Sequence, residues 1–374
     1  MPRPGTGGRL AGDGRIDVSD AHRLAAYLAG VLPYNRLAPE AIVTTFAGSG
    51  KPEQGGGDYA DGPVGSARFR TPWTVDVDRR GVIYVADTFN HCVRKIVDGI
   101  VTTLAGVASA RRSRGGWVDG PADRCEFYWP KDVAADEQGT VYVVDENHTV
   151  RVIAPDGSTT TLAGGGRPGY RDGVGRDALF NEPSGIARLP NGDLLVADTG
   201  NDCLRLVTLD GRVSTWAGDP KRPGFEDGPG VEARFDQPWG VAVDRRGFAY
   251  VADGRNNAIR RISPAGFVFT LAGDGDPGVE DGLGRAARFT VPMSVDVDGE
   301  GNIYTSDWTQ HTIRRISAKG EVSTLAGIRG LGALRDGPGS EAAFTSPMGL
   351  AVGPDGDLYV ADTDNQRIRK IRQR

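Results

Sequence analysis

The chain repeats one pattern six times, and this repetition restricts its possible folds more than any other feature. A short apolar stretch ending in Asp recurs as YVAD, YVVD, LVAD, YVAD, YTSD and YVAD. A Pro stands 15 residues before each of these Asp residues, and AG pairs recur at spacings of 54 to 58 residues. A fixed period of this length indicates a repeat architecture, in which each unit packs on its neighbours.

Within each copy, apolar side chains alternate with a period of two, as in WGVAVD at residues 239–244. That period is typical of β-strands, and turns such as DRRG lead into the Asp-ending strand. Two further strand patterns follow in each copy, as in NNAIRRI and FVFTLAG. Six four-stranded sheets, each too small to be stable alone, predict an all-β fold: a six-bladed β-propeller of antiparallel blades.

The two ends of the repeat region predict how the ring closes. Residues 42–48, IVTTFAG, match a fourth strand that has no first three strands before it, and the last copy has no fourth strand. We expect residues 42–48 to pair into the last blade as its outer strand, which leaves no unpaired gap in the ring. The predicted domains are therefore an N-terminal extension, residues 1–41, and the propeller, residues 42–374.

The pattern resembles the NHL-repeat family of six-bladed propellers. The stretches YVADTFNHCVRKI and YVADTDNQRIRKI are similar to the family's repeat core, and the resemblance covers about residues 42–374. It implies the propeller fold. It leaves the function open, because such propellers serve as enzymes, RNA binders and protein scaffolds.

Residues 1–41 resemble half of a dockerin module, a calcium loop followed by a helix. Asp13, Gly14 and Asp20 fit calcium-loop positions, but Arg9 and Ala11 stand where two ligands are needed. We therefore favour a short helical extension, with one helix starting near Ser19, over a calcium site.

Composition excludes several function classes. The formal net charge is −5, so attraction to nucleic acid or to an anionic membrane is not expected. Three Cys residues argue against a disulfide framework, and no stretch is apolar enough to span a membrane. We expect a monomer without a cofactor, cytoplasmic, or secreted if a signal has been removed upstream.

Residues shared by all six copies are expected to serve the fold, because the fold is what all six blades have in common. The shared residues are the strand-end Asp, an Arg in the third strand, a Phe and an Asp–Gly pair in the long loop. We predict that the Asp and Arg residues pair and that the Phe residues form wedges between blades.

Residues that occur in one copy only are the candidates for function. The positions after each Pro and after each strand-end Asp should surround the channel mouth at one face of the ring. The predicted ligand-binding residues there are Trp73, Thr74, Ser184, Trp239, Met293, Ser294, Trp308 and Met348. Only blade 2 carries charge at these positions, and its Lys131, Asp132 and Glu146 are the candidate catalytic residues.

The chemistry expected of this cluster is free of metal. The zinc ligands of an NHL-type amidating lyase are His residues directly after Pro, and this chain has none there. A Glu146 carboxylate beside Trp308 or Trp239 would have a raised pKa and could exchange protons, as the resemblance to strictosidine-synthase-like propellers also implies. Lys131 could bind a carboxylate or form a Schiff base. The alternative is a plain salt bridge of Lys131 with Glu146 or Asp132.

Three functions remain open at this point. The first is binding of a small organic or peptide ligand at the channel mouth, with lyase or cyclase chemistry on it. The second is a protein-interaction scaffold that uses the loops of this face, above all the blade-2 loop with Arg111, Arg112 and Arg114. Binding of single-stranded RNA ranks last, because no basic stripe crosses several blades.

Overall fold

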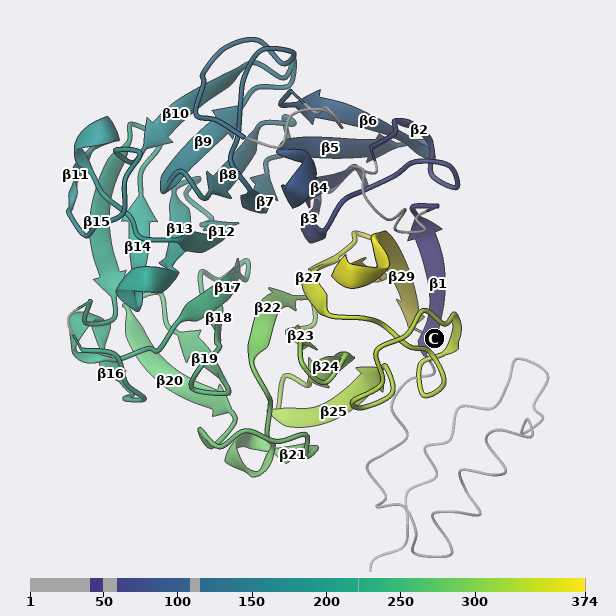
Figure 1. Cartoon of the computed structure of the whole chain (residues 1–374). Helices are drawn as coiled ribbons and strands as arrows, with labels where there is room; N and C mark the ends of the chain where they lie inside the picture. Colours follow the sequence, from purple (N-terminus) through teal and green to yellow (C-terminus); the bar gives the residue numbers. More distant parts are fainter. Residues whose placement is uncertain (1–40, 50–58, 108–114, 221, 374) are drawn as a thin grey trace, which may run out of the picture. The chain divides into compact units, whose positions relative to one another are not determined.

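Short strands joined by tight turns form six antiparallel sheets that stand around a central axis (Figure 1). The computed structural model describes residues 41–49, 59–107, 115–220 and 222–373. These residues belong to one unit, Ala41–Arg374. The predicted six-bladed β-propeller is confirmed. The dockerin-like stretch and Arg111, Arg112 and Arg114 lie outside the described residues.

Each blade has four main strands, from the innermost to the outermost. Blade 1 contains β3 (Pro72–Val77), β4 (Ile83–Asp87), β5 (Cys92–Val97) and β6 (Ile100–Ala105). Blade 2 contains β7 (Pro130–Ala135), β8 (Val141–Asp145), β9 (Thr149–Ile153) and β10 (Thr159–Ala163). Blade 3 contains β12 (Pro183–Arg188), β13 (Leu194–Asp198), β14 (Cys203–Val207) and β15 (Arg212–Ala217).

The other three blades follow the same order. Blade 4 contains β17 (Pro238–Val243), β18 (Ala249–Asp253), β19 (Ala258–Ile262) and β20 (Phe267–Ala272). Blade 5 contains β22 (Pro292–Val297), β23 (Ile303–Asp307), β24 (Thr312–Ile316) and β25 (Glu321–Ala326). Blade 6 contains β27 (Pro347–Val352), β28 (Leu358–Asp362), β29 (Arg367–Gln373) and β1 (Ala41–Ala47).

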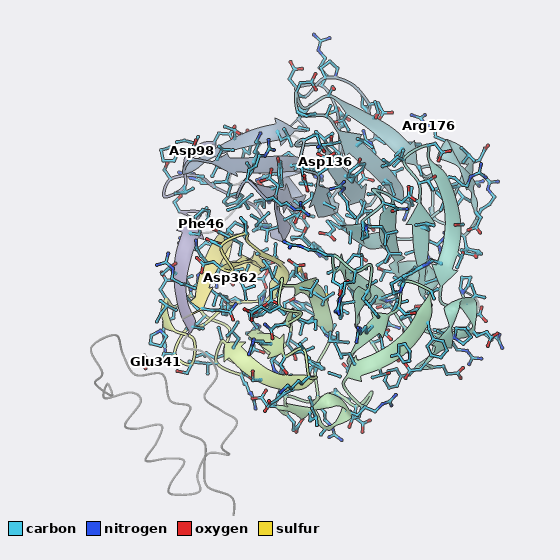
Figure 2. All side chains as sticks on the ribbon, turned by 180° about the vertical axis from the view of Figure 1, so that it is seen from behind. Phe46, Asp98, Asp136, Arg176, Glu341 and Asp362 are labelled. Atoms are coloured by element: carbon cyan, nitrogen blue, oxygen red, sulfur yellow. The ribbon has the colours of Figure 1, made fainter. Side chains whose placement is uncertain are left out.

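Strand β1 comes from the start of the described chain and yet lies in the last blade. It pairs antiparallel with β29, with Ala41 opposite Gln373 and Thr45 opposite Arg369. Phe46 of β1 packs edge-on against Tyr359, with ring centroids 5.1 Å apart. Figure 2 shows the side chains from behind, with Phe46 on this outer strand. Blade 6 is thus built from both ends of the propeller.

Two-residue strands and three of the 3-10 turns lie in the long loops between blades, and the other three 3-10 turns directly follow the second strand of a blade. The short strands lie outside the main strands in five blades: β2 (Gly62–Pro63), β11 (Gly173–Val174), β16 (Gly228–Pro229), β21 (Gly282–Leu283) and β26 (Gly337–Pro338). The 3-10 turns are η2 (Thr88–Asn90), η3 (Gly175–Asp177), η4 (Thr199–Asn201), η5 (Gly230–Glu232), η6 (Gly284–Ala286) and η7 (Thr363–Asn365). We call the face that carries η2, η4 and η7 the top face.

The hydrophobic core is divided into six clusters, each between two neighbouring blades. Every cluster contains one fully buried loop Phe. These residues are Phe69, Phe127, Phe180, Phe235, Phe289 and Phe344. The prediction that they are wedges between blades is confirmed. Burial of a Phe side chain contributes about 1.5–3 kcal/mol, so each wedge helps to hold its two blades together.

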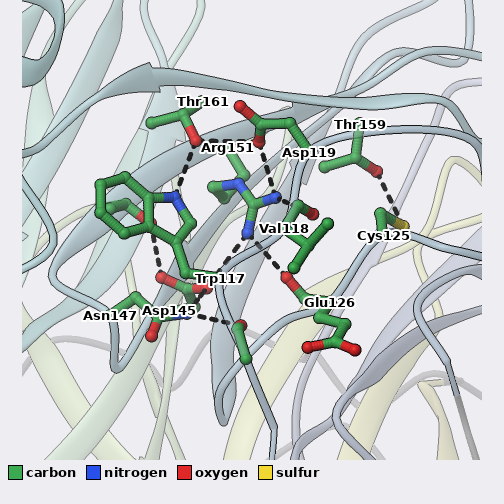
Figure 3. A network of polar contacts seen from close by, with 12 residues as sticks. Trp117, Val118, Asp119, Cys125, Glu126, Asp145, Asn147, Arg151, Thr159 and Thr161 are labelled. Atoms are coloured by element: carbon green, nitrogen blue, oxygen red, sulfur yellow. Dashed lines mark hydrogen bonds and ion pairs between the residues drawn. The ribbon is translucent and has the colours of Figure 1, made fainter.

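The shared Arg of each blade is buried and binds two carboxylates of its own blade. Arg205 donates to Asp198 at 2.7 Å and to Asp172 at 2.6 Å, and its guanidinium lies 5.3 Å from the Phe180 ring centre. Figure 3 shows the equivalent Arg151 beside Asp119 and Asp145. The predicted pairing of Asp and Arg is confirmed, and it occurs within blades.

The innermost strands approach one another so closely that some positions accept only Gly. A Cβ atom at Gly349 would lie 2.3 Å from the Cα of Thr74 in blade 1. A Cβ at Gly240 would lie 2.7 Å from the Cα of Ser294. Real Cβ atoms do not approach other atoms this closely, so these glycines set the distance between innermost strands.

Candidate functional site

Blade 2 carries a buried ion pair at the top face. Lys131 is the second residue of β7, and Glu146 follows β8 directly. The Lys131 Nζ lies 2.6 Å from a carboxylate oxygen of Glu146, with side-chain exposures of 8% and 21%. Among the described residues, this carboxylate is the sole partner of the Lys131 ammonium, which has three protons to donate. Lys131 and Glu146 thus form the salt bridge that the sequence offered as the alternative to catalysis, and their catalytic role stays a prediction.

Two further titratable groups surround this pair. The charges of Glu146, Lys131 and Glu182 all act on His148, although burial is the main reason why the pKa of His148 lies below its usual value. The Nδ1 of His148 accepts a hydrogen bond from the backbone N–H of Glu182, at 3.0 Å. Sequence reasoning missed both residues. The signal for Glu182 was that no other blade has a carboxylate directly before its Pro.

The third candidate, Asp132, is bound in a different way. One of its carboxylate oxygens accepts from the N–H of Ile186 in blade 3, at 2.8 Å, and the other accepts from the N–H of Val133. Burial raises the pKa of Asp132 to about 7. Its carboxylate therefore joins the innermost strands of blades 2 and 3 and is not directed at Glu146.

Two Asp residues that sequence reasoning missed bridge innermost strands in the same way. Asp76 accepts from the N–H of Ala135 at 2.6 Å, and Asp296 accepts from the N–H of Val352 at 2.7 Å. Burial raises both pKa values, that of Asp296 to about 7. The negative charge of Asp76 adds to the rise in the pKa of both Asp132 and Asp296.

The predicted hydroxyl residues of the mouth also make hydrogen bonds within the protein. Thr74 donates to the carbonyl of Lys131 at 2.9 Å, and the Leu350 N–H donates to Ser294 at 3.3 Å. The Ser184 hydroxyl is hydrogen-bonded to Thr199. Each hydroxyl therefore has a structural partner, and its role in ligand binding stays a prediction.

The predicted apolar residues differ in exposure. Met293 is buried, whereas Trp73, Trp239, Trp308 and Met348 are half-buried. The Trp239 indole lies across Gly254, where a Cβ atom would be 2.5 Å from the ring. The role of these residues in lining a ligand pocket also stays a prediction.

A column of stacked rings stands at the junction of blades 1 and 2. The ring centres of Phe89 and Trp129 are 5.4 Å apart, those of Trp129 and Tyr128 are 4.9 Å apart, and those of Tyr128 and His91 are 5.8 Å apart. Trp129 is 36% exposed. Sequence reasoning missed this aromatic column, although no other copy has an aromatic residue at the positions of Phe89, Tyr128 and Trp129.

Within the described residues, no three His, Cys, Asp or Glu side chains are arranged to hold a metal ion. All three Cys residues are free and buried. In the same part of the chain, no helix is long and apolar enough to cross a membrane.

Comparisons with known proteins agree with this architecture. A family model described as NHL repeat matches residues 69–96, 180–205, 235–262 and 344–371. Protein SUPPRESSOR OF QUENCHING 1, chloroplastic, of Arabidopsis thaliana is 30% identical over 309 residues, which are 77% of this chain and 29% of that protein. NHL repeat-containing protein 2 of Bos taurus is 28% identical over 83% of this chain and 40% of its own length. The chain thus spans less than half the length of these curated relatives.

Solved structures share the fold. An auxiliary nutrient binding protein of Bacteroides ovatus matches with a TM-score of 0.65 and 18% identity, over 90% of this chain and 77% of its own. Virginiamycin B lyase of Staphylococcus aureus matches with a TM-score of 0.52 and 13% identity, over 89% and 99%. At these identities the likeness concerns the fold alone. By its matched repeats and its relatives, the chain belongs to the NHL-repeat family of β-propellers.

Proposed function

We propose that the protein binds a small organic or peptide ligand at the top face, at the blade-2 side of the channel mouth. The observation that carries this proposal is the Lys131 ammonium, which is buried with a single carboxylate partner among the described residues. Burial of a charge is costly unless its hydrogen bonds are satisfied. An acceptor group of a ligand would satisfy the remaining donors of this ammonium.

The fold has no need for this charge. At the same position the other blades have Trp73, Ser184, Trp239, Met293 and Met348. All six blades form their strands, wedges and Arg–Asp pairs whichever of these residues is present. A costly feature that the architecture does not need is best explained by what it binds.

The pair also suits acid–base chemistry of the lyase or cyclase type. Glu146 keeps an exposed fraction of 21% and is the group that would take a proton from a bound ligand. Lys131 is the group that would stabilise negative charge on a nearby ligand oxygen. The names of two proteins with this fold, an auxiliary nutrient binding protein and a lyase, are compatible with binding and with chemistry respectively.

A ligand screen tests the proposal. Sugars, amino acids, dipeptides and small organic acids would be screened by thermal shift and confirmed by titration calorimetry. We expect K131M and E146Q to weaken a confirmed ligand at least about tenfold, as loss of a hydrogen bond to a charged group does. Lys319→Met, at an exposed turn, is the matched control and should bind normally. Equal affinity in all four proteins would refute the site.

The second candidate function is a protein-interaction scaffold, and the aromatic column favours it. Trp, Tyr and Arg residues are frequent energetic centres of interfaces. Trp129 stacks on Phe89, and Arg70 lies 5.8 Å from the Phe89 ring centre. On this account, W129A would abolish capture of a partner while K131M leaves it intact. The reverse pattern would support the ligand site instead.

A further inference from the structure

Neighbouring blades are joined at the top face by a hydrogen bond that recurs at all six junctions. The residue after each top-face turn accepts, through its side chain, from the backbone N–H of the residue before the next blade's Pro. We call each such contact a latch. The acceptor–donor pairs are His91–Trp129 (3.3 Å), His148–Glu182 (3.0 Å), Asp202–Gln237 (2.8 Å), Asn257–Val291 (3.1 Å), His311–Ser346 (3.0 Å) and Gln366–Thr71 (2.6 Å).

Both residues of every latch have an unusual backbone. All twelve have positive φ, between 47 and 59°. L-residues adopt this left-handed region reluctantly, above all β-branched ones such as Val291 and Thr71. Such conformations persist only where the surroundings hold them, so the latch is one of the contacts that fix these two loops.

Three of the six acceptors can lose their lone pair at acid pH. In His91, His148 and His311 the accepting atom is Nδ1, which requires the neutral imidazole with its proton on Nε2. Protonation puts a hydrogen on Nδ1, which then faces an N–H group. The imidazolium cannot accept the hydrogen bond, whereas Asn257 and Gln366 accept at any pH.

We propose that the three histidine latches open on acidification and loosen the junctions of blades 1 with 2, 2 with 3 and 5 with 6. The His148 latch matters most for the proposed site, because Lys131 and Glu146 act on the same imidazole and Glu182 is its donor residue. An imidazolium there would compete with Lys131 for the Glu146 carboxylate. The device goes beyond ligand binding, and its test needs no ligand.

The groups around each imidazole agree with a neutral resting state. His91 faces Arg70 and the Tyr128 ring, and His311 faces Asp364. His148 faces Glu146, Lys131 and Glu182. Burial is the leading reason why the pKa of each of the three lies below its usual value. The latches are therefore closed at neutral pH and open as the pH falls through these lowered values.

Hydrogen exchange of the donor amides, followed by NMR from pH 7.5 to 5.0, tests the device. After correction for intrinsic rates, we expect the Glu182 amide to lose protection by up to about tenfold per pH unit below the histidine pKa. The Trp129 and Ser346 amides should behave alike. The Val291 amide, whose acceptor is Asn257, is the internal control and should stay protected.

Two substitutions should exchange the pH dependence of the latches between blades 2 and 4. H148N copies the blade-4 residue into blade 2 and should make the Glu182 amide insensitive to pH. N257H does the reverse and should make the Val291 amide sensitive. If Glu182, Ser346, Trp129 and Val291 lose protection equally in the wild type, or if neither variant changes its amide, the proposal is wrong.

Discussion

The ammonium of Lys131 lies 2.6 Å from the carboxylate of Glu146 at the top face of blade 2. The other five blades have no such pair of charged residues at the equivalent positions. Both side chains are largely withdrawn from solvent. Coulomb attraction in such a place is strong, but so is the cost of desolvation. The pair therefore adds little to the stability of the fold. It does hold two charges in fixed positions, where we propose that a ligand binds.

Removal of one member of this pair should destabilise the protein more than removal of both. E146Q leaves a buried ammonium without a counter-charge, and we expect a loss of about 2–4 kcal/mol in the free energy of unfolding. The charge-free variant K131M/E146Q should recover most of this loss. Urea titrations at pH 7 measure the difference, and additive losses in the double variant would contradict the buried pair.

The Arg–Asp pairs should contribute unequally to the free energy of unfolding from one blade to another. Arg205 lies 2.7 Å from its strand-end Asp198, whereas Arg314 lies 3.9 Å from Asp307. We expect R205M to cost about 3–5 kcal/mol, because a buried carboxylate loses its partner, and R314M to cost clearly less. Urea titration of both variants decides this, with exposed Arg212→Met as the control. A larger loss for R314M would be evidence against this ranking.

The glycines of the innermost strands should resist substitution. G349A would put a Cβ 2.3 Å from the Thr74 Cα, and we expect a loss of about 1–3 kcal/mol or more from the forced backbone shift. A Cβ at Gly299 would meet nothing within 4 Å beyond its chain neighbours, so G299A is the matched control and should change stability by less than about 0.5 kcal/mol. Thermal unfolding of the two variants compares them. Equal melting temperatures would contradict the tight packing around the axis.

The free energy of unfolding should depend on pH because of the raised pKa of Asp132. Its folded pKa of about 7 exceeds the ordinary Asp value of 3.8, so the folded state binds the extra proton between these values. Its contribution is therefore complete below pH 3.8 and is lost as the pH rises through about 7, at up to about 1.4 kcal/mol per pH unit.

In D132N this decline should be less steep than in the wild type by up to about 1.4 kcal/mol per pH unit, and Asp296, whose pKa is also raised to about 7, should account for part of what remains. Urea titrations at several pH values between 5 and 8 compare its slope with that of the wild type and of D177N, a change at an exposed turn. Parallel profiles for the wild type and D132N would show that Asp132 titrates normally.

Comparison of the six copies predicted the fold because strands and wedges leave local patterns. The alternation in residues 239–244 and the shared Phe residues are properties of one repeat, and each repeat indicated the same structure. The Arg–Asp pairing followed in the same way, because both partners recur in every blade.

Contacts that depend on the approach of two blades could not be predicted. Asp76 and Asp296 bind backbone N–H groups of a neighbouring innermost strand, and a backbone acceptor or donor has no signature in the sequence. The latches were hidden for the same reason, since their donors are main-chain groups with positive φ. The aromatic column joins Phe89 with Trp129, whose stacking depends on the junction of two blades.

The most direct test of ligand binding at blade 2 uses the charge-free variant K131M/E146Q. A confirmed ligand from the screen would be titrated calorimetrically into this variant and into the wild type, after urea titration has shown that their stabilities agree. We expect the variant to fold normally and to bind the ligand at least about tenfold more weakly than the wild type. Unchanged affinity in a variant without either charge would show that the ligand does not bind at Lys131 and Glu146.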